Sequence, residues 1–267
     1  MSEHPRAIAA ARGLIAEYGI TEPESIDLEA IAFDRGVFVR EAPLTGSWGR
    51  LLRKGSGGVI RISSAIQSEG QKRFCIAHEM GHFLLHENSD QLAFCSSKDM
   101  LPWYKSRPEE PEASAFAAEA IMPEQMFRER CPRSDSLRLG HLEQIADDFQ
   151  ATITATAYRF VELGSHMCAL VISEGGTTKW FRAGPDFPFR LKGARVDVDI
   201  NTCAGDFFKH GDSTKMEEDV PATAWLDDER VEETWIIREL LLPMPSFKSA
   251  LTILWVVPGS PLDSVDL

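Results

Sequence analysis

Apolar residues recur at helical spacing near the start of the chain. Between positions 5 and 20 they fall on one stripe, at Ile8, Ala11, Leu14, Ile15 and Tyr18. A second short helix is predicted over residues 27–33, and Gly36 just beyond it suits the left-handed conformation that ends many helices. We therefore expect the chain to begin with two helices that each bury one face.

The pattern then changes to that of strands. Runs rich in β-branched or aromatic residues lie at 37–40, 48–53 and 58–63. The last two runs are joined by a short segment, 54–57, that contains two glycines and suits a hairpin turn. These runs predict a small antiparallel sheet directly ahead of the next helix.

A strongly apolar helix is predicted over residues 73–86, and it carries a His-Glu-x-x-His pattern. His78 and His82 are four positions apart, so they are neighbours on one helical face. Such a pair is typical of a zinc site, which in enzymes takes three protein ligands and keeps one position open. Glu79 follows the first histidine, where a carboxylate is able to take a proton from metal-bound water. His86 continues the row, but it lies about 12 Å from His78 along the helix axis and is too distant to share the ion.

A short pattern of this kind can also occur by chance on a helix that only packs in a core. The context favours the metal site. Phe74, Ile76 and Leu84 supply an apolar surface that would bury the helix, and Gly81 leaves room for another group to approach its backbone.

A second helix, predicted over 109–122, offers carboxylates for the third ligand. Pro111 suits its first turn and Pro123 lies just beyond its end. Glu112 and Glu119 share a face but stand about 10 Å apart along the axis, so only one of them can reach the ion. Spacing leaves that choice open, and for each carboxylate a solvated position on the helix surface is the alternative.

The two segments together resemble the ImmA/IrrE family of metallopeptidases. The resemblance covers about residues 5–165 and rests on the His-Glu-x-x-His helix and on Glu112-Ala113-x-x-Phe116-Ala117-Ala118-Glu119-x-x-Met122-Pro123. It implies that Glu112 is the third metal ligand beside His78 and His82. It also implies Zn²⁺ as the cofactor, with Mn²⁺ as the alternative ion, and Glu79 as the catalytic base. Ser114 stands where many relatives have Asn.

Composition and charge limit which partners the protein can bind and in which compartment it is found. The net charge of −13 opposes direct binding of nucleic acid, because Lys and Arg must neutralise its phosphates. No run approaches the roughly eighteen apolar residues of a membrane helix, and the N-terminus lacks the layout of a signal peptide. The five cysteines are scattered and form no Cys-x-x-Cys pair, as expected of reduced thiols. We expect a cytoplasmic protein that contacts no membrane.

Residues 139–164 are expected to form two helices with a tight connection, similar to a helix-turn-helix. The second helix carries only Arg159 as a positive charge, with Glu162 opposing it, so we favour a structural helix pair over DNA reading. From residue 165 onward, short β-branched runs between Gly, Pro and acidic turns predict a β-rich domain. The expected fold is α+β, with a zincin-like metallopeptidase domain at 1–164 and a β-rich sensor or interaction domain at 165–267.

Two functions follow from these patterns. The first is a zinc-dependent endopeptidase, and the resemblance implies a protein substrate such as a helix-turn-helix transcriptional repressor in a stress or mobile-element response. The alternative is a non-catalytic, metal-containing regulatory or binding protein acting on transcription. Glu79 favours the peptidase, because a purely structural site has no use for a base.

Residues 87–108 are expected to form an irregular loop, and Tyr104 and His141 are weaker candidates for stabilising an oxyanion.

Overall fold

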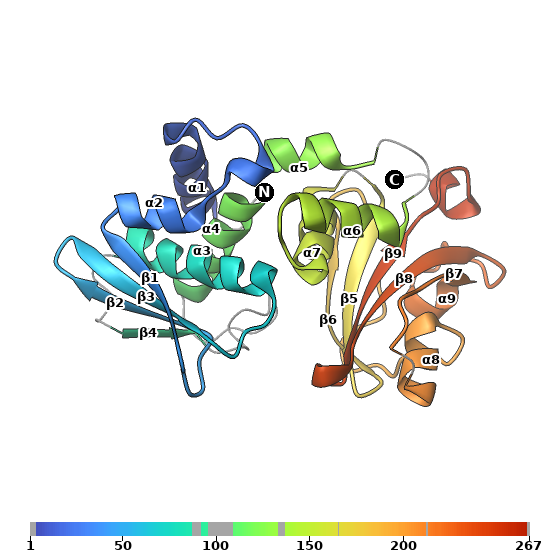
Figure 1. The fold of residues 1–267 in the computed structure, drawn as a ribbon. Helices are drawn as coiled ribbons and strands as arrows, with labels where there is room; N and C mark the ends of the chain where they lie inside the picture. The colour runs from blue at the N-terminus through green and yellow to red at the C-terminus, as the bar shows by residue number, and fades with distance from the viewer. Residues whose placement is uncertain are drawn as a thin grey trace. The chain divides into compact units, whose positions relative to one another are not determined.

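The computed structural model describes residues 4–86, 92–95, 109–132, 137–164, 166–211 and 213–265. The chain divides into two compact units, the first formed by Met1–Glu129 with Ala146–Thr152 and the second by Arg130–Ile145 with Ile153–Leu267. Each unit combines helices with one sheet, so the α+β class predicted from the sequence is confirmed (Figure 1). Residues 130–145 belong to the second unit, and the expected domain boundary at 164 stays a prediction.

The first unit begins with the two predicted helices, α1 (Pro5–Glu17) and α2 (Leu28–Asp34). The predicted stripe of α1 is its buried face, which includes Ala11, Leu14 and Ile15. The Asp27 side chain accepts a hydrogen bond from the backbone N–H of Ala30 at 2.9 Å and so caps α2. Beyond α2, Gly36 has φ of 74°, as expected for the residue that ends the helix.

The sheet of the first unit contains β1 (Val37–Ala42), β2 (Gly49–Lys54), β3 (Gly57–Ser63) and β4 (Leu92–Cys95), in the order β1-β3-β2-β4. β2 is antiparallel to β3 and β4, but β1 runs parallel to β3, so the sheet is mixed where an antiparallel one was predicted. The difference arises because β1 pairs with β3 and not with β2, the next strand along the chain. Strand patterns do not reveal which strands become neighbours.

β4 lies inside the segment that the sequence predicted to be irregular. Only its backbone pairing with β2 is described. The rest of that segment, including Tyr104, lies outside the described residues.

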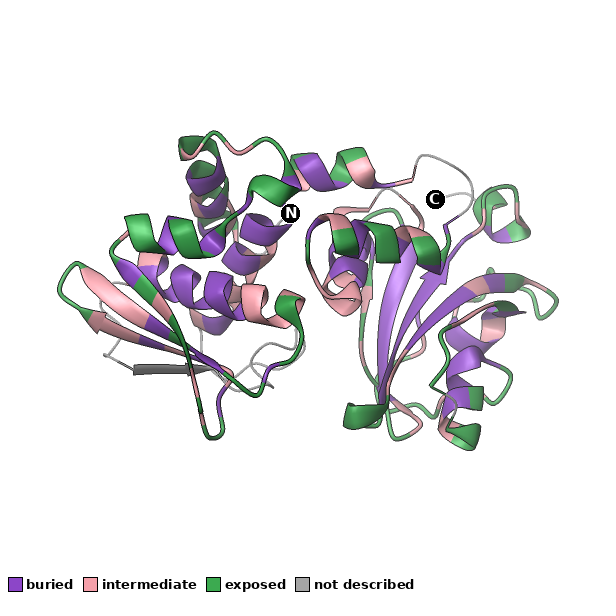
Figure 2. Ribbon diagram, viewed as in Figure 1, coloured by how far each residue is buried: buried purple, intermediate pink, exposed green. Residues whose placement is uncertain are grey.

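Three helices complete the first unit: α3 (Glu69–Leu85), α4 (Glu109–Ile121) and α5 (Glu124–Arg130), the last ending at its border. The Ser68 side chain accepts a hydrogen bond from the backbone N–H of Gln71 at 3.4 Å, so α3 begins four residues before the predicted start. α3 and α4 pack closely at Gly81, where an added Cβ would lie 3.0 Å from Cα of Ala113. The facing surfaces of both helices are buried (Figure 2).

The second unit is built on a five-stranded antiparallel sheet, as the β-rich pattern predicts. Its order is β6-β5-β9-β8-β7. The bounds are β5 (Cys168–Glu174), β6 (Thr177–Ala183), β7 (Met216–Pro221), β8 (Ile236–Met244) and β9 (Ser249–Trp255). The remaining elements are α8 (Cys203–His210), α9 (Ala222–Trp225) and the short 3₁₀ segments η2 (Pro245–Phe247) and η3 (Pro261–Ser264), with η1 (Pro23–Ser25) in the first unit.

One of the β-branched runs from residue 165 onward lies at 195–200, and it forms only an isolated bridge between Asp197 and Thr177. Val198 packs against the core, but Val196 and Ile200 are both exposed. Arg195 has φ of 69°, which interrupts an extended backbone. The alternating pattern was present without the burial that would make it a strand.

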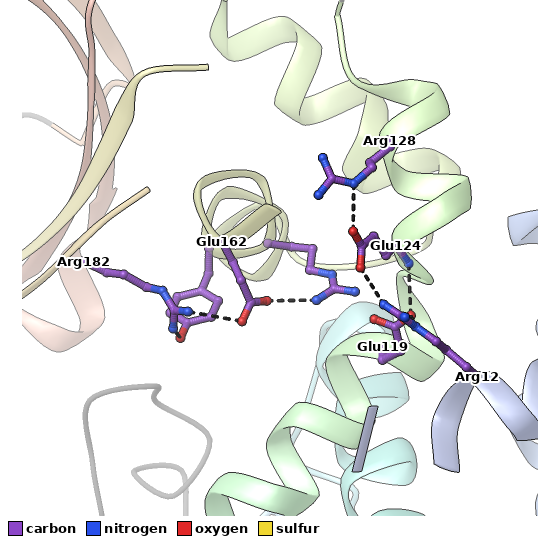
Figure 3. A network of polar contacts seen from close by, with 8 residues as sticks. Arg12, Glu119, Glu124, Arg128, Glu162 and Arg182 are labelled. Carbon is purple, nitrogen blue, oxygen red and sulfur yellow. Dashed lines mark hydrogen bonds and ion pairs between the residues drawn. The ribbon is translucent and has the colours of Figure 1, made fainter. Parts of the chain in front are cut away.

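The predicted helix pair is present as α6 (Leu139–Asp148) and α7 (Ile153–Leu163). Arg159, the one positive charge of α7, is 3% exposed and pairs with Glu162 at 2.9 Å. Glu162 also pairs with Arg182 of β6 at 3.5 Å (Figure 3). α7 therefore presents no exposed cation for phosphate contacts. Within the part of the chain that is described, no helix has both the length and the apolar character needed to cross a bilayer.

Candidate metal centre

α3 brings two histidine rings together in the interior of the first unit. His78 is 0% exposed and His82 is 3% exposed. Their Nε2 atoms lie 3.2 Å apart, as the spacing of four along the helix predicted. Two imidazole nitrogens thus point at one small volume.

The first turn of α4 adds a carboxylate to this pair. Oε2 of Glu110 lies 3.1 Å from Nε2 of His78 and 3.4 Å from Nε2 of His82. With the 3.2 Å between the histidines, the three atoms form a nearly equilateral triangle. A tetrahedral ion with bonds of 2.0–2.1 Å holds its ligand atoms about 3.3 Å apart. The three side chains therefore fit one face of a tetrahedral metal site.

Glu112, the ligand expected from the family resemblance, is not in this triangle. Its carboxylate lies 3.7 Å from Nε2 of His86 instead. Glu110 and Glu112 are two positions apart on one helix, which turns their side chains about 200° away from each other. The spacing of apolar residues in α4 indicates that Glu110 is buried. Glu110 lies on the same helical face as Ala113, Ala117 and Ile121, which are all buried.

Glu119, the other carboxylate considered from spacing, is held by groups outside the histidine pair. It is 1% exposed and accepts hydrogen bonds from Nε of Arg12 at 2.8 Å and from the backbone N–H of Glu124 at 3.2 Å. Arg12 also pairs with Glu124 at 2.5 Å, and Arg128 pairs with Glu124 at 2.9 Å (Figure 3). Glu119 thus joins α1, α4 and the start of α5.

Glu79 is buried completely and lies against strand β2. A Cβ added to Gly49, the first residue of that strand, would lie 2.6 Å from Oε1 of Glu79 and 3.2 Å from its Cγ. A contact that short would force the carboxylate of Glu79 to shift, so a glycine at position 49 lets the carboxylate pass the strand undisturbed. The position of Glu79 is therefore set both by α3 and by the backbone of β2.

Two neighbours orient the histidines. Oγ of Ser114 lies 3.3 Å from Nδ1 of His78, and an Nδ1–H that donates to it leaves the Nε2 lone pair directed at the ion site. The His86 ring packs beside that of His82, with centroids 5.5 Å apart. Burial lowers the pKa of His86. Its place outside the triangle agrees with the sequence argument that it is too distant to be a ligand.

The charge of the triangle favours a cation. Burial by itself would raise the pKa of Glu110, but its hydrogen bonds to His78 and His82 outweigh burial and hold that pKa well below its usual range. Glu110 is therefore an anion in a buried site beside two nitrogen ligands.

His141, a weaker candidate from the sequence, lies at the start of α6, where its Nδ1 accepts a hydrogen bond from the backbone N–H of Arg138 at 3.2 Å.

Three of the matches with known proteins bear on this site. Residues 32–161 match the family of the IrrE N-terminal-like domain. Metallopeptidase ImmA of Bacillus subtilis (strain 168) is 33% identical over 111 residues, which are 40% of this chain and 57% of that protein. The match thus spans little more than half of that relative.

The third match is a solved structure described as a Mycobacterium tuberculosis transcriptional regulator. It has a TM-score of 0.62 and 13% identity and covers 98% of this chain and 92% of that chain, a likeness of fold. The family match contains all of β2, α3 and α4, on which the buried histidines, Glu79 and Glu110 lie. Residues 32–161 of this chain therefore carry the domain that is similar to the ImmA/IrrE family.

Proposed function

We propose that the protein is a peptide-bond hydrolase that uses one divalent ion held by His78, His82 and Glu110. The observation that supports this most strongly is the buried triangle of ligand atoms, with edges of 3.1–3.4 Å, whose two histidines lie on the helix that also carries the buried carboxylate of Glu79. A structural metal site is usually closed by a fourth protein ligand. The triangle instead offers three protein ligands, the number that a catalytic zinc site takes.

The proposed mechanism divides the work between the ion and Glu79. When bound, the ion supplies Lewis acidity and lowers the pKa of a coordinated water to about 7. Glu79 would take a proton from the attacking water as the water oxygen bonds to the peptide carbonyl carbon. It would return that proton to the peptide nitrogen as the C–N bond breaks and the amine leaves. Because Gly49 and α3 fix its carboxylate, Glu79 performs both transfers without first having to be ordered.

We propose Zn²⁺ as the working ion, with Mn²⁺ as the alternative. Two neutral imidazole nitrogens and one carboxylate oxygen form a ligand set that zinc enzymes use. Oxygen-rich sites suit manganese better, so a set with two nitrogens favours zinc.

We propose a protein substrate, in particular a helix-turn-helix transcriptional repressor. The similarity to this family and the net charge of −13 support a protein partner rather than a nucleic acid. A cytoplasmic location is part of the same proposal. Cys168 and Cys203 are buried thiols, as expected in a reducing compartment, and burial raises the pKa of each to about 12.

The decisive experiment compares the parent with Glu79→Gln, each supplied with Zn²⁺. A small helix-turn-helix repressor encoded beside this protein is the first substrate, and mass spectrometry follows its fragments. We expect cleavage to fall by about 10²–10⁴-fold, the usual contribution of a general base. Zinc content should stay near one ion per chain, since Glu79 is not a ligand. Glu112→Gln, which changes another carboxylate of the same unit, is the matched control and should cleave like the parent.

Two outcomes would contradict the proposal. Equal cleavage by the parent and Glu79→Gln would remove Glu79 from the mechanism. A parent that binds zinc but cleaves neither that repressor nor a broad peptide library would favour the non-catalytic regulatory protein.

A further inference from the structure

The second unit contains a cavity of about 640 Å³ that is separate from the metal centre. Its wall is formed by α8, the loop before it, the β5–β6 turn and the segment that joins β8 to β9. Two backbone hydrogen bonds fasten these segments to one another. Gly175 N–H donates to the carbonyl of Lys248 at 3.0 Å, and Val198 N–H donates to that of Gly176 at 2.9 Å.

The lining of this cavity combines apolar side chains with two cations. Val198, Ile200, Phe207 and Phe208 supply most of the apolar surface. Lys209 and Lys248 are the only charged residues in the lining. Both lysines are exposed, and no carboxylate of the described residues forms an ion pair with either. In a chain of net charge −13, this is a local excess of positive charge at the mouth of an apolar hollow.

The wall formed by α8 is fixed by interactions at the start of the helix. Glu239 accepts hydrogen bonds from the backbone N–H groups of Cys203 and Ala204 at 3.1 and 3.0 Å. Oγ1 of Thr202 accepts one from the N–H of Gly205 at 2.9 Å. A cavity whose wall is already ordered loses less conformational entropy when a ligand binds.

The other side of the cavity is open to solvent. Gly175, Gly176 and Gly211 each face empty space, since an added Cβ would meet no atom within 4 Å. Ile200 at the rim is 70% exposed. When a ligand covers an apolar side chain this exposed, apolar surface is removed from water and the complex is stabilised.

We propose that this cavity binds a small organic anion that has an apolar body and a single carboxylate or equivalent head group. The apolar body would lie against Phe207, Phe208 and Ile200, and the head group would pair with Lys209 and Lys248. The volume lies in the range of about 300–1,000 Å³ that small-molecule sites occupy. Asp206 on α8 is not part of the lining, so direct contact of the head group is with the two lysines.

The test measures binding to the full-length protein and is independent of any peptidase activity. Decanoate is the probe, titrated calorimetrically and by displacement of the fluorescent sulfonate 8-anilinonaphthalene-1-sulfonate. We expect one saturable site per chain and binding of decanol at least about 5-fold weaker, because it lacks the charge that pairs with the lysines. Absence of saturable decanoate binding up to about 1 mM, which corresponds to roughly −4 kcal/mol, would overturn the proposal.

Variants at exposed positions then locate the site without disturbing the core. Lys209→Gln and Lys248→Gln should each weaken decanoate binding by about 5-fold, the effect of one solvent-exposed ion pair. Ile200→Ser should weaken decanoate and decanol alike, because it removes apolar contact only. Lys179→Gln, an exposed lysine on β6 outside the lining, is the control and should bind like the parent. Equal affinity in the parent and both lining lysine variants would place the ligand elsewhere.

Discussion

Two buried glutamates, one in each unit, differ in their ionisation because their partners differ. Glu110 is 2% exposed and faces two imidazole nitrogens, which hold its pKa well below the usual range despite burial. Glu239 is 0% exposed and accepts hydrogen bonds from two backbone amides and, at 3.1 Å, from Nε1 of Trp225. There burial outweighs the hydrogen bonds and raises the pKa to about 7.

Burial alone therefore does not identify a functional carboxylate, but the chemistry of its partners does. Imidazoles can carry positive charge and can bind a cation, so the groups around Glu110 form a set of ligands. Amides and indole donate hydrogen bonds but bind no metal, so the groups around Glu239 only fix the start of α8. This comparison predicts different consequences for the same change, Glu to Gln, in the two units.

The largest effect is expected for Glu110→Gln. Loss of the only anionic ligand should weaken zinc binding by more than about 100-fold, because changes outside the ligand set already cost about 10–100-fold. Competition with a chelating dye measures the affinity. Glu112→Gln and Glu239→Gln should both retain zinc. If Glu112→Gln lost the ion and Glu110→Gln kept it, the ligand assignment from the sequence would be right and the one from the structure wrong.

The next effect concerns the carboxylate that is not a ligand. Gly49→Ala should push Glu79 from its place and lower the peptidase rate by about 100-fold, the typical cost of a displacement near 1 Å. Zinc content should not change. Gly58→Ala is the matched control in the same sheet, since its Cβ would lie 3.0 Å from the carbonyl of Leu52 and would not touch Glu79. A similar loss of rate in both variants would indicate general damage to the sheet.

Glu239 should make stability depend on pH. Its pKa is raised from 4.5 to about 7, so between these values the folded state holds a proton that the unfolded state has released. The stabilisation is complete below about pH 4.5 and is lost as pH rises from there through 7, by roughly 3 kcal/mol in total. Urea unfolding of the second unit, followed from pH 5 to 8, measures it. In Glu239→Gln this slope should disappear, and an unchanged slope would assign the proton to another group.

The smallest effect is expected for Ser114→Ala. The contact from its Oγ to Nδ1 of His78 is long, at 3.3 Å. Its loss should therefore weaken zinc binding by about 10-fold, the lower end of the range for residues that hydrogen-bond a metal ligand. Ser114→Asn, which restores a hydrogen-bonding side chain, should recover most of the affinity in the same dye competition. Unchanged affinity in Ser114→Ala would mean that α3 alone orients the ring.

Much of the fold was predictable because its main elements bury one face. The stripe of α1 and the alternation of β2 show this periodicity, whereas β5 and β9 are buried on both faces and are marked by nearly continuous apolar runs. α8 was missed because it has eight residues and includes Gly205. The edge strand β7 was missed because it is mostly acidic and lacks the β-branched residues that mark strands.

The site was predictable only as far as its residues are close in sequence. His78, Glu79 and His82 follow from one helical pattern, whereas Glu110 depends on how α4 is rotated against α3. The partner of Glu119 is Arg12, which is 107 residues away and appears in no local pattern. Gly49 is likewise distant from Glu79 in sequence, so its role becomes visible only when β2 and α3 pack together.

The close contact of α3 and α4 at Gly81 sets which ions the centre can accept. The histidines belong to one helix and Glu110 to the other, so the distance between the helices fixes the size of the triangle. A Cβ at Gly81 would lie only 3.0–3.3 Å from Ala113 and Phe116, and relieving it would part the helices by a few tenths of an ångström. That is about the difference between zinc bonds of 2.0–2.1 Å and calcium bonds of 2.3–2.6 Å. The absence of a side chain at Gly81 thus keeps the ligand triangle at the size that suits an ion as small as zinc.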